Sequence, residues 1–428
     1  MSAQPYKRQV DVCIGKGGQR VGRLTYVKDG AREYSSYVYD ESWLTDPGRF
    51  EISSELPLVE GHMTRRAPTQ DDSCFPFAVS DTEPDAWGCR VIARAHAKAR
   101  QKNPQLGQLT AFDYLSAVND FSRVGALRLR EGTSRYLQTV AQGMRATPPV
   151  LELQRMYYAS RAVEAGTETA EDLQYLQGKG TSLGGMRPKC TVLEEDSALA
   201  LGKFPSVNDV RNVTRAEVLA LHLAHRAGID AATSRIVQIA DTSIAVIRRF
   251  DRTPDHGRIH YMSAASMLEA ARNQDRSYTE VADVIRARCA EPTRDARQLW
   301  RRLVFNHLIT NVDDHLKNLG FLYAGQGKWR LAPAFDLNPF PDKDRESKTW
   351  LSEDQGPIVS LQMLMERADY FGLQRPEAAT IVREVHAAVA DWRALATSAQ
   401  VGLHSHELSD FAPAFEHADM DAAGGLVG

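Results

Sequence analysis

The sequence NVDDHLKN, residues 311–318, places two adjacent acids, a histidine, a lysine and two asparagines within eight residues. It directly follows LWRRLVFNHLIT, residues 299–310, in which the spacing of apolar side chains predicts an amphipathic helix. Asp and Asn also gather at helix ends and turns for capping alone, which is the ordinary explanation of such a stretch. The alternative is a loop that the helix anchors and that holds its acids for chemistry.

The spacing within and after this stretch favours the chemical interpretation. Asp313 and Asn318 are five residues apart, and Asp336 follows in LAPAFDLNP, residues 331–339. In protein kinases a catalytic-loop aspartate accepts the proton of the substrate hydroxyl, an asparagine five residues later holds magnesium, and a further aspartate holds magnesium against the phosphates. Oxygen ligands of this kind are needed because a triphosphate carries heavy negative charge. A single D-x₄-N is a weak signal, so its weight depends on other motifs.

A glycine-containing stretch upstream fits the same chemistry. SLGGMRPK, residues 182–189, lies between two predicted strands. Gly184 and Gly185 allow close backbone approach and present N–H groups to phosphate oxygens, and Arg187 and Lys189 add positive charge. The sequence therefore predicts a phosphate loop here.

A lysine on an apolar strand and a glutamate on the following helix extend the series. Lys203 ends SALALGK, and it either lies exposed at a sheet edge or reaches the ATP phosphates, paired with an acid of the next helix. Glu217 in TRAEVLALHLAHRAGI is the available acid, and its alternative role is a capping box with Thr214. The order of glycine loop, lysine, glutamate, D-x₄-N and aspartate is that of a eukaryotic-like kinase, although GxGxxGxV, HRD and DFG are absent.

The composition of the 428-residue chain limits the class of protein. Hydrophobic residues make up 43% and charged residues 25%, an ordinary globular balance, and the length predicts two or three domains. The formal charge of −3 argues against a protein that binds nucleic acid over its whole surface. We expect no signal peptide and no membrane span, because no apolar run is long enough. Five scattered cysteines without a CxxC pair favour a reducing cytoplasm and argue against structural zinc.

The patterning divides the chain into β-rich and helical parts. The first part predicts strands joined by turns, and GKGGQRVG, residues 15–22, is interpreted as a turn and not as a nucleotide loop. A helical pattern then begins at about residue 87, with four basic residues on one face: Arg90, Arg94, Lys98 and Lys102. That face is interpreted as solvated, with a partner contact as the alternative. After residue 251 the chain is expected to be mostly helical up to about residue 403, with a frayed tail.

Taken in order, these motifs resemble those of the HipA-type serine/threonine kinases, the toxin halves of bacterial toxin–antitoxin pairs. The stretches that carry the resemblance are SLGGMRPK (182–189), GKFP (202–205), RRFDR (248–252), NVDDHLKN (311–318) and LAPAFDLNP (331–339). VGRLTY, ISSELPL and EPDAWGCRVIAR extend it into the N-terminal part, so that it covers roughly residues 10–400.

The resemblance implies an α+β, kinase-like two-lobed fold of the HipA and phosphoinositide-kinase kind, β-rich in its N-terminal part and mostly helical in its C-terminal lobe. The domains implied are a HipA-type β-rich domain over residues 1–105, a glycine-loop and nucleotide-binding lobe over 106–250, a helical catalytic lobe over 251–410 and a flexible tail over 411–428.

The resemblance also implies roles for individual residues. Asp313 is the expected catalytic aspartate, and Asn318 and Asp336 are the expected magnesium ligands. The residues expected to bind ATP are Ser182, Leu183, Gly184, Gly185, Met186, Arg187, Lys203, Arg249, Phe250, His315, Asn318 and Asp336. Ser182 is the expected autophosphorylation site, where a dianion would repel the nucleotide phosphates and silence the kinase.

Two residues depart from the family pattern. Asp314 adds an acid beside Asp313, either to hold metal or to cap, and Arg248 replaces an acid before the hinge, which puts the nucleotide preference in doubt. The family implies ATP and Mg²⁺ as cofactors and a HipB-like helix-turn-helix antitoxin that carries the contact with operator DNA. It also implies a protein substrate such as an aminoacyl-tRNA synthetase, no membrane, and a cytoplasmic location.

Two other functions stay open on the sequence. A metal-dependent hydrolase could use Asp313, Asp314, His315 and Asp336 around one metal, but it leaves the glycine loop and Lys203 unexplained. A nucleotide-binding scaffold that holds an antitoxin without transferring phosphate would keep the motifs without the catalysis.

Overall fold

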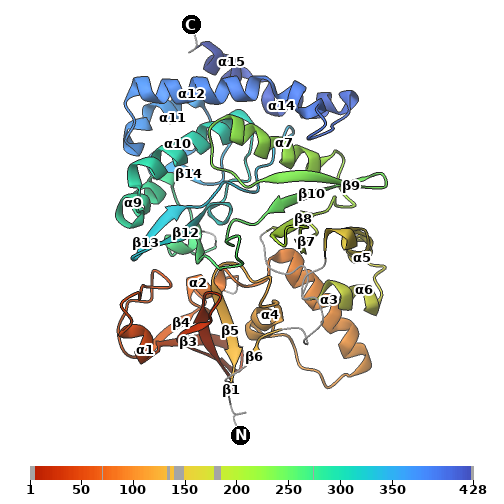
Figure 1. Ribbon diagram of the computed structural model, residues 1–428, viewed down its shortest axis with the longest axis vertical. Helices are drawn as coiled ribbons and strands as arrows, with labels where there is room; N and C mark the ends of the chain where they lie inside the picture. The colour runs from red at the N-terminus through yellow and green to blue at the C-terminus, as the bar shows by residue number, and fades with distance from the viewer. Residues whose placement is uncertain are drawn as a thin grey trace. The chain divides into compact units, whose positions relative to one another are not determined.

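The computed structural model describes residues 5–69, 71–132, 135–138, 149–177, 185–272 and 274–425 (Figure 1). The backbone forms two compact units. The first unit is Met1–Val207 with Asp251–Met262, and the second is Asn208–Phe250 with Ser263–Gly428. The chain therefore passes between the units three times, and neither unit is one continuous segment. The four expected domain ranges follow other boundaries and remain predictions.

The first unit contains a six-stranded sheet whose neighbouring strands are antiparallel, in the order β4-β3-β2-β1-β5-β6. Its strands bury large aromatic side chains, among them Tyr26 and Tyr37, which are fully enclosed. The glycine run at residues 15–18 is confirmed as the turn between two strands, and Gly30, at φ +59°, closes the next hairpin. The strands are β1 (Tyr6–Ile14), β2 (Gln19–Asp29), β3 (Arg32–Tyr39), β4 (Met63–Arg66), β5 (Leu127–Glu131) and β6 (Arg135–Tyr136).

Helices and a separate hairpin complete the first unit. The helices are α1 (Glu41–Leu44), α2 (Phe77–Ser80), α3 (Ala86–Lys102), α4 (Ala111–Ala117), the 3₁₀ turn η1 (Val150–Glu152), α5 (Leu153–Ala165) and α6 (Ala170–Leu176). The hairpin consists of β7 (Lys189–Leu193) and β8 (Leu199–Lys203), paired antiparallel. The helix predicted from residue 87 is confirmed as α3.

The basic face of α3 is partly engaged within the first unit: Arg90 and Lys102 are exposed, as a solvated face predicts, whereas Arg94 and Lys98 are half-buried beside Glu168. Arg94 lies 3.2 Å from the buried Glu168 carboxylate, and Lys98 donates a hydrogen bond to the Glu168 carbonyl. Arg90 donates to the Glu164 carbonyl at 3.4 Å. These bonds hold α3 against the connection between α5 and α6, because two long basic side chains converge on one buried acid.

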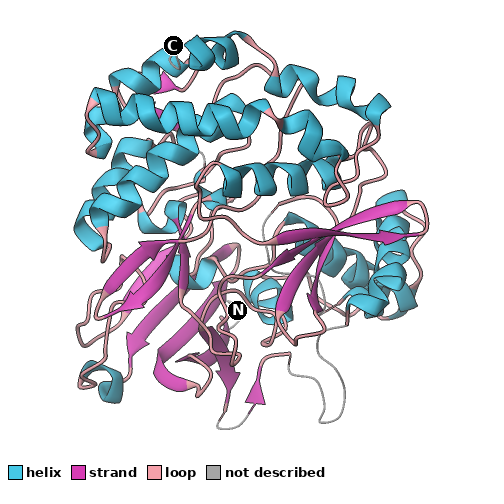
Figure 2. Cartoon of the chain, turned by 45° about the horizontal axis from the view of Figure 1, so that its top comes forward, coloured by secondary structure: helices cyan, strands magenta, loops and turns pink. Residues whose placement is uncertain are grey.

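Helices are the main elements of the second unit (Figure 2). Helix α7 packs on the β9–β10 hairpin, and α12 packs against both α7 and α10. The bounds are α7 (Val213–Arg226), β9 (Ser234–Ile239), β10 (Thr242–Arg248), β11 (Tyr261–Ser263, at the unit boundary), α8 (Ala264–Met267), α9 (Tyr278–Arg288), α10 (Pro292–Leu308), η2 (Leu316–Asn318), β12 (Gly320–Gly325), β13 (Lys328–Leu331), β14 (Trp350–Ser352), β15 (Gly356–Pro357), α11 (Leu361–Glu366), η3 (Ala368–Phe371), α12 (Arg375–Ala390), α13 (Trp392–Thr397), η4 (Ser405–Glu407), α14 (Leu408–Phe415) and α15 (Ala418–Gly425).

The start of α7 corrects the predicted capping box. The N-cap is Asn212, whose side chain accepts the Arg215 N–H at 3.3 Å. Thr214 is already inside the helix and donates its hydroxyl to the Ser243 carbonyl at 2.9 Å. Glu217 is therefore a buried residue of the helix body and not the second member of a capping box.

Helices are the main elements after residue 251, as expected, and the antiparallel hairpins β12–β13 and β14–β15 lie among them. The tail is not frayed over residues 418–425, which form α15 with Met420 and Ala423 buried. His307 on α10 also bonds to Asp419 at 2.6 Å, which ties α15 to the helix before the NVDDHLKN loop.

The five cysteines form no disulfide. Within the ranges that the structure describes, no helix has the length and apolarity that crossing a membrane requires.

Candidate active site

The NVDDHLKN loop is fixed to α10 and to the LAPAFDLNP segment. Thr310, in the left-handed region at φ +52°, donates its hydroxyl to a carbonyl of α14 at 2.9 Å. Asn311 bonds back to α10 twice, from its main-chain N–H to the Asn306 carbonyl at 2.8 Å and from its side chain to Asn306 Oδ1 at 3.1 Å. Its own Oδ1 accepts the Asn338 N–H at 3.3 Å. The predicted helix thus anchors the loop, and Asn311 connects it to the segment that carries Asp336.

Asp313 has a fixed backbone and a carboxylate that solvent reaches. Asn318 donates its side-chain Nδ2 to the Asp313 carbonyl at 2.8 Å. The Asp313 carboxylate forms an ion pair with Lys348 Nζ, and His315 Nε2 lies 3.9 Å from the same oxygen. The Asp313 side chain is 34% exposed, so a solute can approach it. A positioned and accessible carboxylate is the kind of group that can take a proton from a bound hydroxyl.

His315 adds a ring beside that carboxylate. Burial lowers the pKa of His315 from its ordinary value, which favours the neutral imidazole. A neutral ring at this distance orients or accepts hydrogen bonds but adds no charge to the site.

Asp314 has an anchoring role, which resolves the two alternatives that the sequence left for it. Its carboxylate accepts the Tyr278 hydroxyl at 2.7 Å and the Lys348 N–H at 2.6 Å. Thr349 donates its hydroxyl to the Asp314 carbonyl at 2.8 Å. Burial raises the pKa of Asp314 to about 6, because desolvation disfavours the charged form. The side chain therefore ties the loop to α9 and to residues 347–349.

Sequence reasoning missed Tyr278, Lys348 and Thr349. Each of them comes from a segment 34–36 residues away from Asp313 or Asp314 along the chain. No motif marks them, because SKTW and SYTE are unremarkable in composition. Only the fold brings these side chains onto the loop.

Asp336 lies beside the hinge residues. It adopts the left-handed region at φ +55°, and Asn338 donates its side-chain Nδ2 to Asp336 Oδ1 at 3.3 Å. The neighbouring Phe335 ring packs on Phe250 with a centroid separation of 5.5 Å. Arg249, next to Phe250, is buried. The structure thus brings the first three residues of RRFDR, which belong to the second unit, together with the LAPAFDLNP stretch.

Asn318 and Asp336 line one small hollow of about 30 Å³, together with Asp314. The Asn318 nitrogen is used by the Asp313 carbonyl, so the amide oxygen is the atom that can act as a ligand. An amide oxygen and a carboxylate are hard donors of the type that Mg²⁺ prefers, and the phosphates of a nucleotide supply its remaining ligands in kinases. The donor set of these two residues fits a magnesium–nucleotide site.

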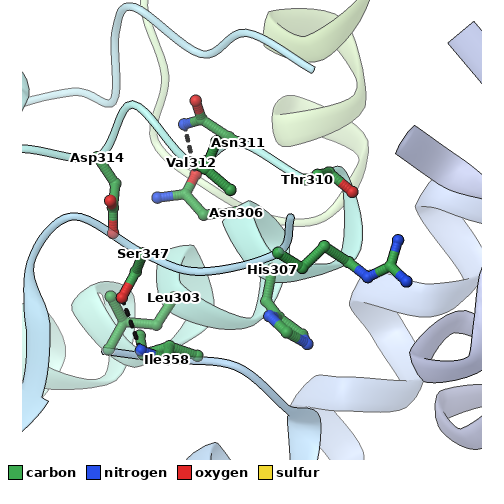
Figure 3. Close-up of a pocket in the computed structure, with 10 residues that line it drawn as sticks. Leu303, Asn306, His307, Thr310, Asn311, Val312, Asp314, Ser347 and Ile358 are labelled. Atoms are coloured by element: carbon green, nitrogen blue, oxygen red, sulfur yellow. Dashed lines mark hydrogen bonds between the residues drawn. The ribbon is translucent and has the colours of Figure 1, made fainter. Parts of the chain in front are cut away.

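A second small hollow, of about 20 Å³, lies beside the loop (Figure 3). Figure 3 shows the Asn311 side chain bonded directly to that of Asn306, at 3.1 Å, while Asp314 and Ser347 come from two different segments. The Ile358 N–H donates to the Ser347 hydroxyl at 2.7 Å. These hydrogen bonds link the loop to α10 and hold residues 345–358 together beside it.

The geometry does not favour the hydrolase alternative. Both oxygens of the Asp314 carboxylate accept hydrogen bonds from Tyr278 and Lys348, which a metal ligand would have to give up. Within the described ranges, no three His, Cys, Asp or Glu side chains gather as a metal-binding group.

The remaining candidates belong to the first unit. Gly185 has φ +89° and its carbonyl accepts the Trp87 N–H at 3.4 Å, whereas Met186 is 80% exposed. Lys189 is buried and lies 2.9 Å from the Asp85 carboxylate, so its charge is compensated within the unit and does not serve as free positive charge for phosphate. Lys203 ends β8 and is buried, which excludes the exposed sheet-edge interpretation.

Some of the predicted phosphate loop lies outside the described residues, namely Ser182, Leu183 and Gly184. Arg187 is described and is half-buried. The roles of all these residues remain predictions.

Comparison with known proteins identifies the family. Residues 181–392 match the model of the HipA-like C-terminal domain. The chain is a HipA-family protein. Over 351 residues it is 25% identical to "Putative kinase Y4mE" of Sinorhizobium fredii (strain NBRC 101917 / NGR234), and the match covers 75% of each chain. Over 188 residues it is 25% identical to "Putative kinase" of Haemophilus influenzae (strain ATCC 51907 / DSM 11121 / KW20 / Rd), covering 38% of this chain and 55% of that protein.

The HipA fold extends over the whole chain. A structure described as the "Shewanella oneidensis MR-1 Toxin Antitoxin System HipA, HipB and its operator DNA complex" contains a chain that matches with a TM-score of 0.65. The match covers 97% of this chain and 96% of that one, at 16% sequence identity. The expected mixed α and β fold of the HipA kind is thereby confirmed.

Proposed function

We propose that this HipA-family protein is an ATP-dependent protein serine/threonine kinase of the toxin type. The observation that carries the proposal is the arrangement around Asp313, a reachable carboxylate on a fixed backbone, with Asn318 and Asp336 on one hollow beside it. Two relatives bear the name of kinases, which supports phosphoryl transfer as the reaction class. Serine or threonine as the acceptor rests on the resemblance of the motifs.

In the proposed reaction each residue of the second unit has one task. Asp313 orients the incoming hydroxyl and takes its proton. Asn318, through its amide oxygen, and Asp336 would hold Mg²⁺, which neutralises phosphate charge when bound. Arg249 and Phe250 would border the adenine, since Phe250 packs against the residue next to Asp336.

Residues of the first unit would bind the phosphates. Lys203 and the segment from Ser182 to Arg187 are assigned this role in the proposal. Ser182 would also accept a phosphoryl group itself, and the added charge would repel the nucleotide and silence the kinase. The proposed partners are a HipB-like helix-turn-helix antitoxin, operator DNA through that antitoxin, and a protein substrate of the aminoacyl-tRNA synthetase type. The complex named in the Shewanella structure supports the antitoxin and DNA as partners.

The test is incubation with Mg²⁺ and γ-labelled ATP, with wild type beside Asp313→Ala and Asp336→Ala, followed by mass spectrometry of the peptide that contains Ser182. We expect label on Ser182 in the wild type alone, with both variants folded. Full transfer by either variant would contradict the proposal. ATP bound without any transfer would favour the scaffold, and hydrolysis of a phosphoester without ATP would favour the hydrolase.

A further inference from the structure

Lys348 extends from a piece of backbone that is clamped on both sides. Its own N–H donates to Asp314 Oδ1 at 2.6 Å. The preceding Ser347 exchanges bonds with Ile358, receiving its N–H at the hydroxyl at 2.7 Å and donating its own N–H to the Ile358 carbonyl at 3.1 Å. The following Thr349 donates its hydroxyl to the Asp314 carbonyl at 2.8 Å. The position of the Lys348 Cα is therefore set by buried and half-buried hydrogen bonds, while the side chain itself is largely exposed.

The Lys348 side chain is directed at the candidate catalytic carboxylate. Its Nζ forms an ion pair with Asp313 Oδ1, and the two side chains are 52% and 34% exposed. An ion pair this exposed adds little to the free energy of folding, because water screens both charges. The clamp thus holds a cation at the carboxylate that takes the proton in the proposed reaction, although the fold gains little from the pair.

A second lysine of the same segment shows that this placement is particular to Lys348. Lys343 has its Nζ 4.5 Å from the centroid of the Phe340 ring and is exposed. Its surroundings are those of an ordinary surface lysine. It provides a control of the same charge, five residues away.

We propose that Lys348 is a catalytic residue that contacts the γ-phosphoryl group of bound ATP while still paired with Asp313, and that binds this group alone during transfer. This inference rests on the proposed kinase function. In kinases with an HRD motif, the residues that assist the catalytic aspartate lie in the same loop. Here the cation beside Asp313 comes from a segment 35 residues downstream.

The exchange of partners follows from the charges in the reaction. As the serine oxygen forms its bond to the γ-phosphorus, the bond from that phosphorus to the β,γ-bridging oxygen breaks, and ADP leaves with those electrons. The hydroxyl proton passes to the Asp313 carboxylate, which becomes neutral. The attraction between Asp313 and Lys348 is lost at that moment, while negative charge persists on the oxygens of the transferring group. The ammonium therefore turns from the carboxyl to the phosphoryl oxygens.

The experiment compares Lys348→Met, Lys348→Arg and the control Lys343→Met in the full-length chain. The first readout is the affinity for ATP and for ADP in the presence of Mg²⁺, by isothermal titration. If Lys348 contacts only the γ-phosphoryl group, Lys348→Met should weaken the affinity for ATP on the order of tenfold and leave the affinity for ADP unchanged. Lys348→Arg keeps most of the preference for ATP, because the charge is retained. The control behaves as wild type.

The second readout is single-turnover transfer of label from γ-labelled ATP, with the thermal midpoint of each variant as a check of folding. We expect Lys348→Met to transfer about 100-fold more slowly with an unchanged midpoint, as is typical for loss of one group that stabilises transition-state charge. Restoration of transfer by Lys348→Arg supports a charge contact and not a packing effect.

The outcomes separate this inference from the proposed function. Wild-type transfer and an unchanged ATP-to-ADP ratio in Lys348→Met overturn the role of Lys348 and leave the kinase standing. If Lys348→Met loses the preference for ATP over ADP but neither wild type nor any variant transfers label, Lys348 contacts the γ-phosphoryl group and the proposed kinase function is overturned. Absence of nucleotide binding in the wild type overturns both.

Discussion

Asp313 and Asp314 are neighbours in the chain, but they differ in solvent exposure and in hydrogen-bond partners. Asp313 is 34% exposed and pairs with a lysine that is more exposed still, whereas Asp314 is buried and accepts hydrogen bonds from Tyr278 and Lys348. One residue is open to a substrate, and the other holds the loop in place. The two aspartates can be separated by substitution.

Substituting each of the two aspartates by alanine should have unequal effects on the free energy of unfolding. Asp314→Ala leaves the Tyr278 hydroxyl and the Lys348 N–H without their acceptor, so we expect a loss of roughly 2–4 kcal/mol in the free energy of unfolding. Asp313→Ala should change it by less than about 1 kcal/mol. Urea denaturation followed by tryptophan fluorescence measures both. A stable Asp314→Ala protein would mean that Asp314 does not anchor the loop.

His260 predicts a pH dependence of stability in the first unit. Its Nε2–H donates to the Ile52 carbonyl at 2.8 Å, and burial lowers the pKa of His260 to about 4. The unfolded chain takes up a proton at its ordinary value of about 6.5, while the folded chain stays neutral. The stabilisation is therefore complete above pH 6.5 and is lost as the pH falls from 6.5 to 4, by about 3 kcal/mol in total.

The measurement is the urea midpoint of wild type and His260→Gln at several pH values across that window. Glutamine can donate to the same carbonyl but cannot be protonated, so the variant should lose less stability than wild type toward pH 4. Parallel pH curves for the two proteins would rule out His260 as the source.

At the scale of elements, α7 shows why local sequence did not determine a helix start. Asn212 and Thr214 are both good N-cap residues, and the spacing of Thr214 to Glu217 matches a capping box. The structure gives the cap to Asn212, because the Thr214 hydroxyl bonds to the Ser243 carbonyl of β10. That bond is a tertiary contact, which no pattern within the helix contains.

Two substitutions of Asn212, the N-cap of α7, test how much this cap contributes to the free energy of unfolding. Asn212→Ala removes the acceptor for the Arg215 N–H and should cost about 1 kcal/mol of unfolding free energy. Asn212→Ser keeps an acceptor oxygen at the N-cap and should recover most of that loss. Thermal denaturation by circular dichroism compares the two variants with wild type. Equal midpoints for wild type and Asn212→Ala would show that the helix does not depend on this cap.

The elements with long, consistent patterns could be predicted, and those with short runs could not. α10 and α3 have many turns of helical spacing, so their existence follows from the sequence. The strands β12 and β13 are only six and four residues long, too short for periodicity alone to separate a strand from a helix. The site divides in the same way, since Asp313, Asn318 and Asp336 follow one another along the chain, while Lys348 and Tyr278 reach the loop only through tertiary packing.

At the scale of the whole molecule, the segment Asp251–Met262 supplies the first unit with contacts that its main part lacks. Asp251 is buried and accepts the Gly125 N–H at 2.7 Å, and it pairs with Arg252 at 2.7 Å. Arg252 in turn donates to the Arg123 carbonyl at 2.7 Å. The RRFDR stretch therefore has two roles, because its first half lies in the second unit beside Phe335 and its second half completes the first unit.

This dependence can be tested with two aspartates of the same segment. Asp251→Ala removes one partner of a buried ion pair and leaves Arg252 and the Gly125 N–H uncompensated, so we expect a loss of roughly 3–5 kcal/mol in the unfolding free energy. Asp255→Ala, at a fully exposed carboxylate, should leave stability unchanged. Amide hydrogen exchange read by mass spectrometry locates the effect: faster exchange in β5 and around Gly125, with α10 and α12 protected as in wild type, is the expected pattern. Uniform acceleration in both units would mean that the segment stabilises the molecule as a whole and not the first unit in particular.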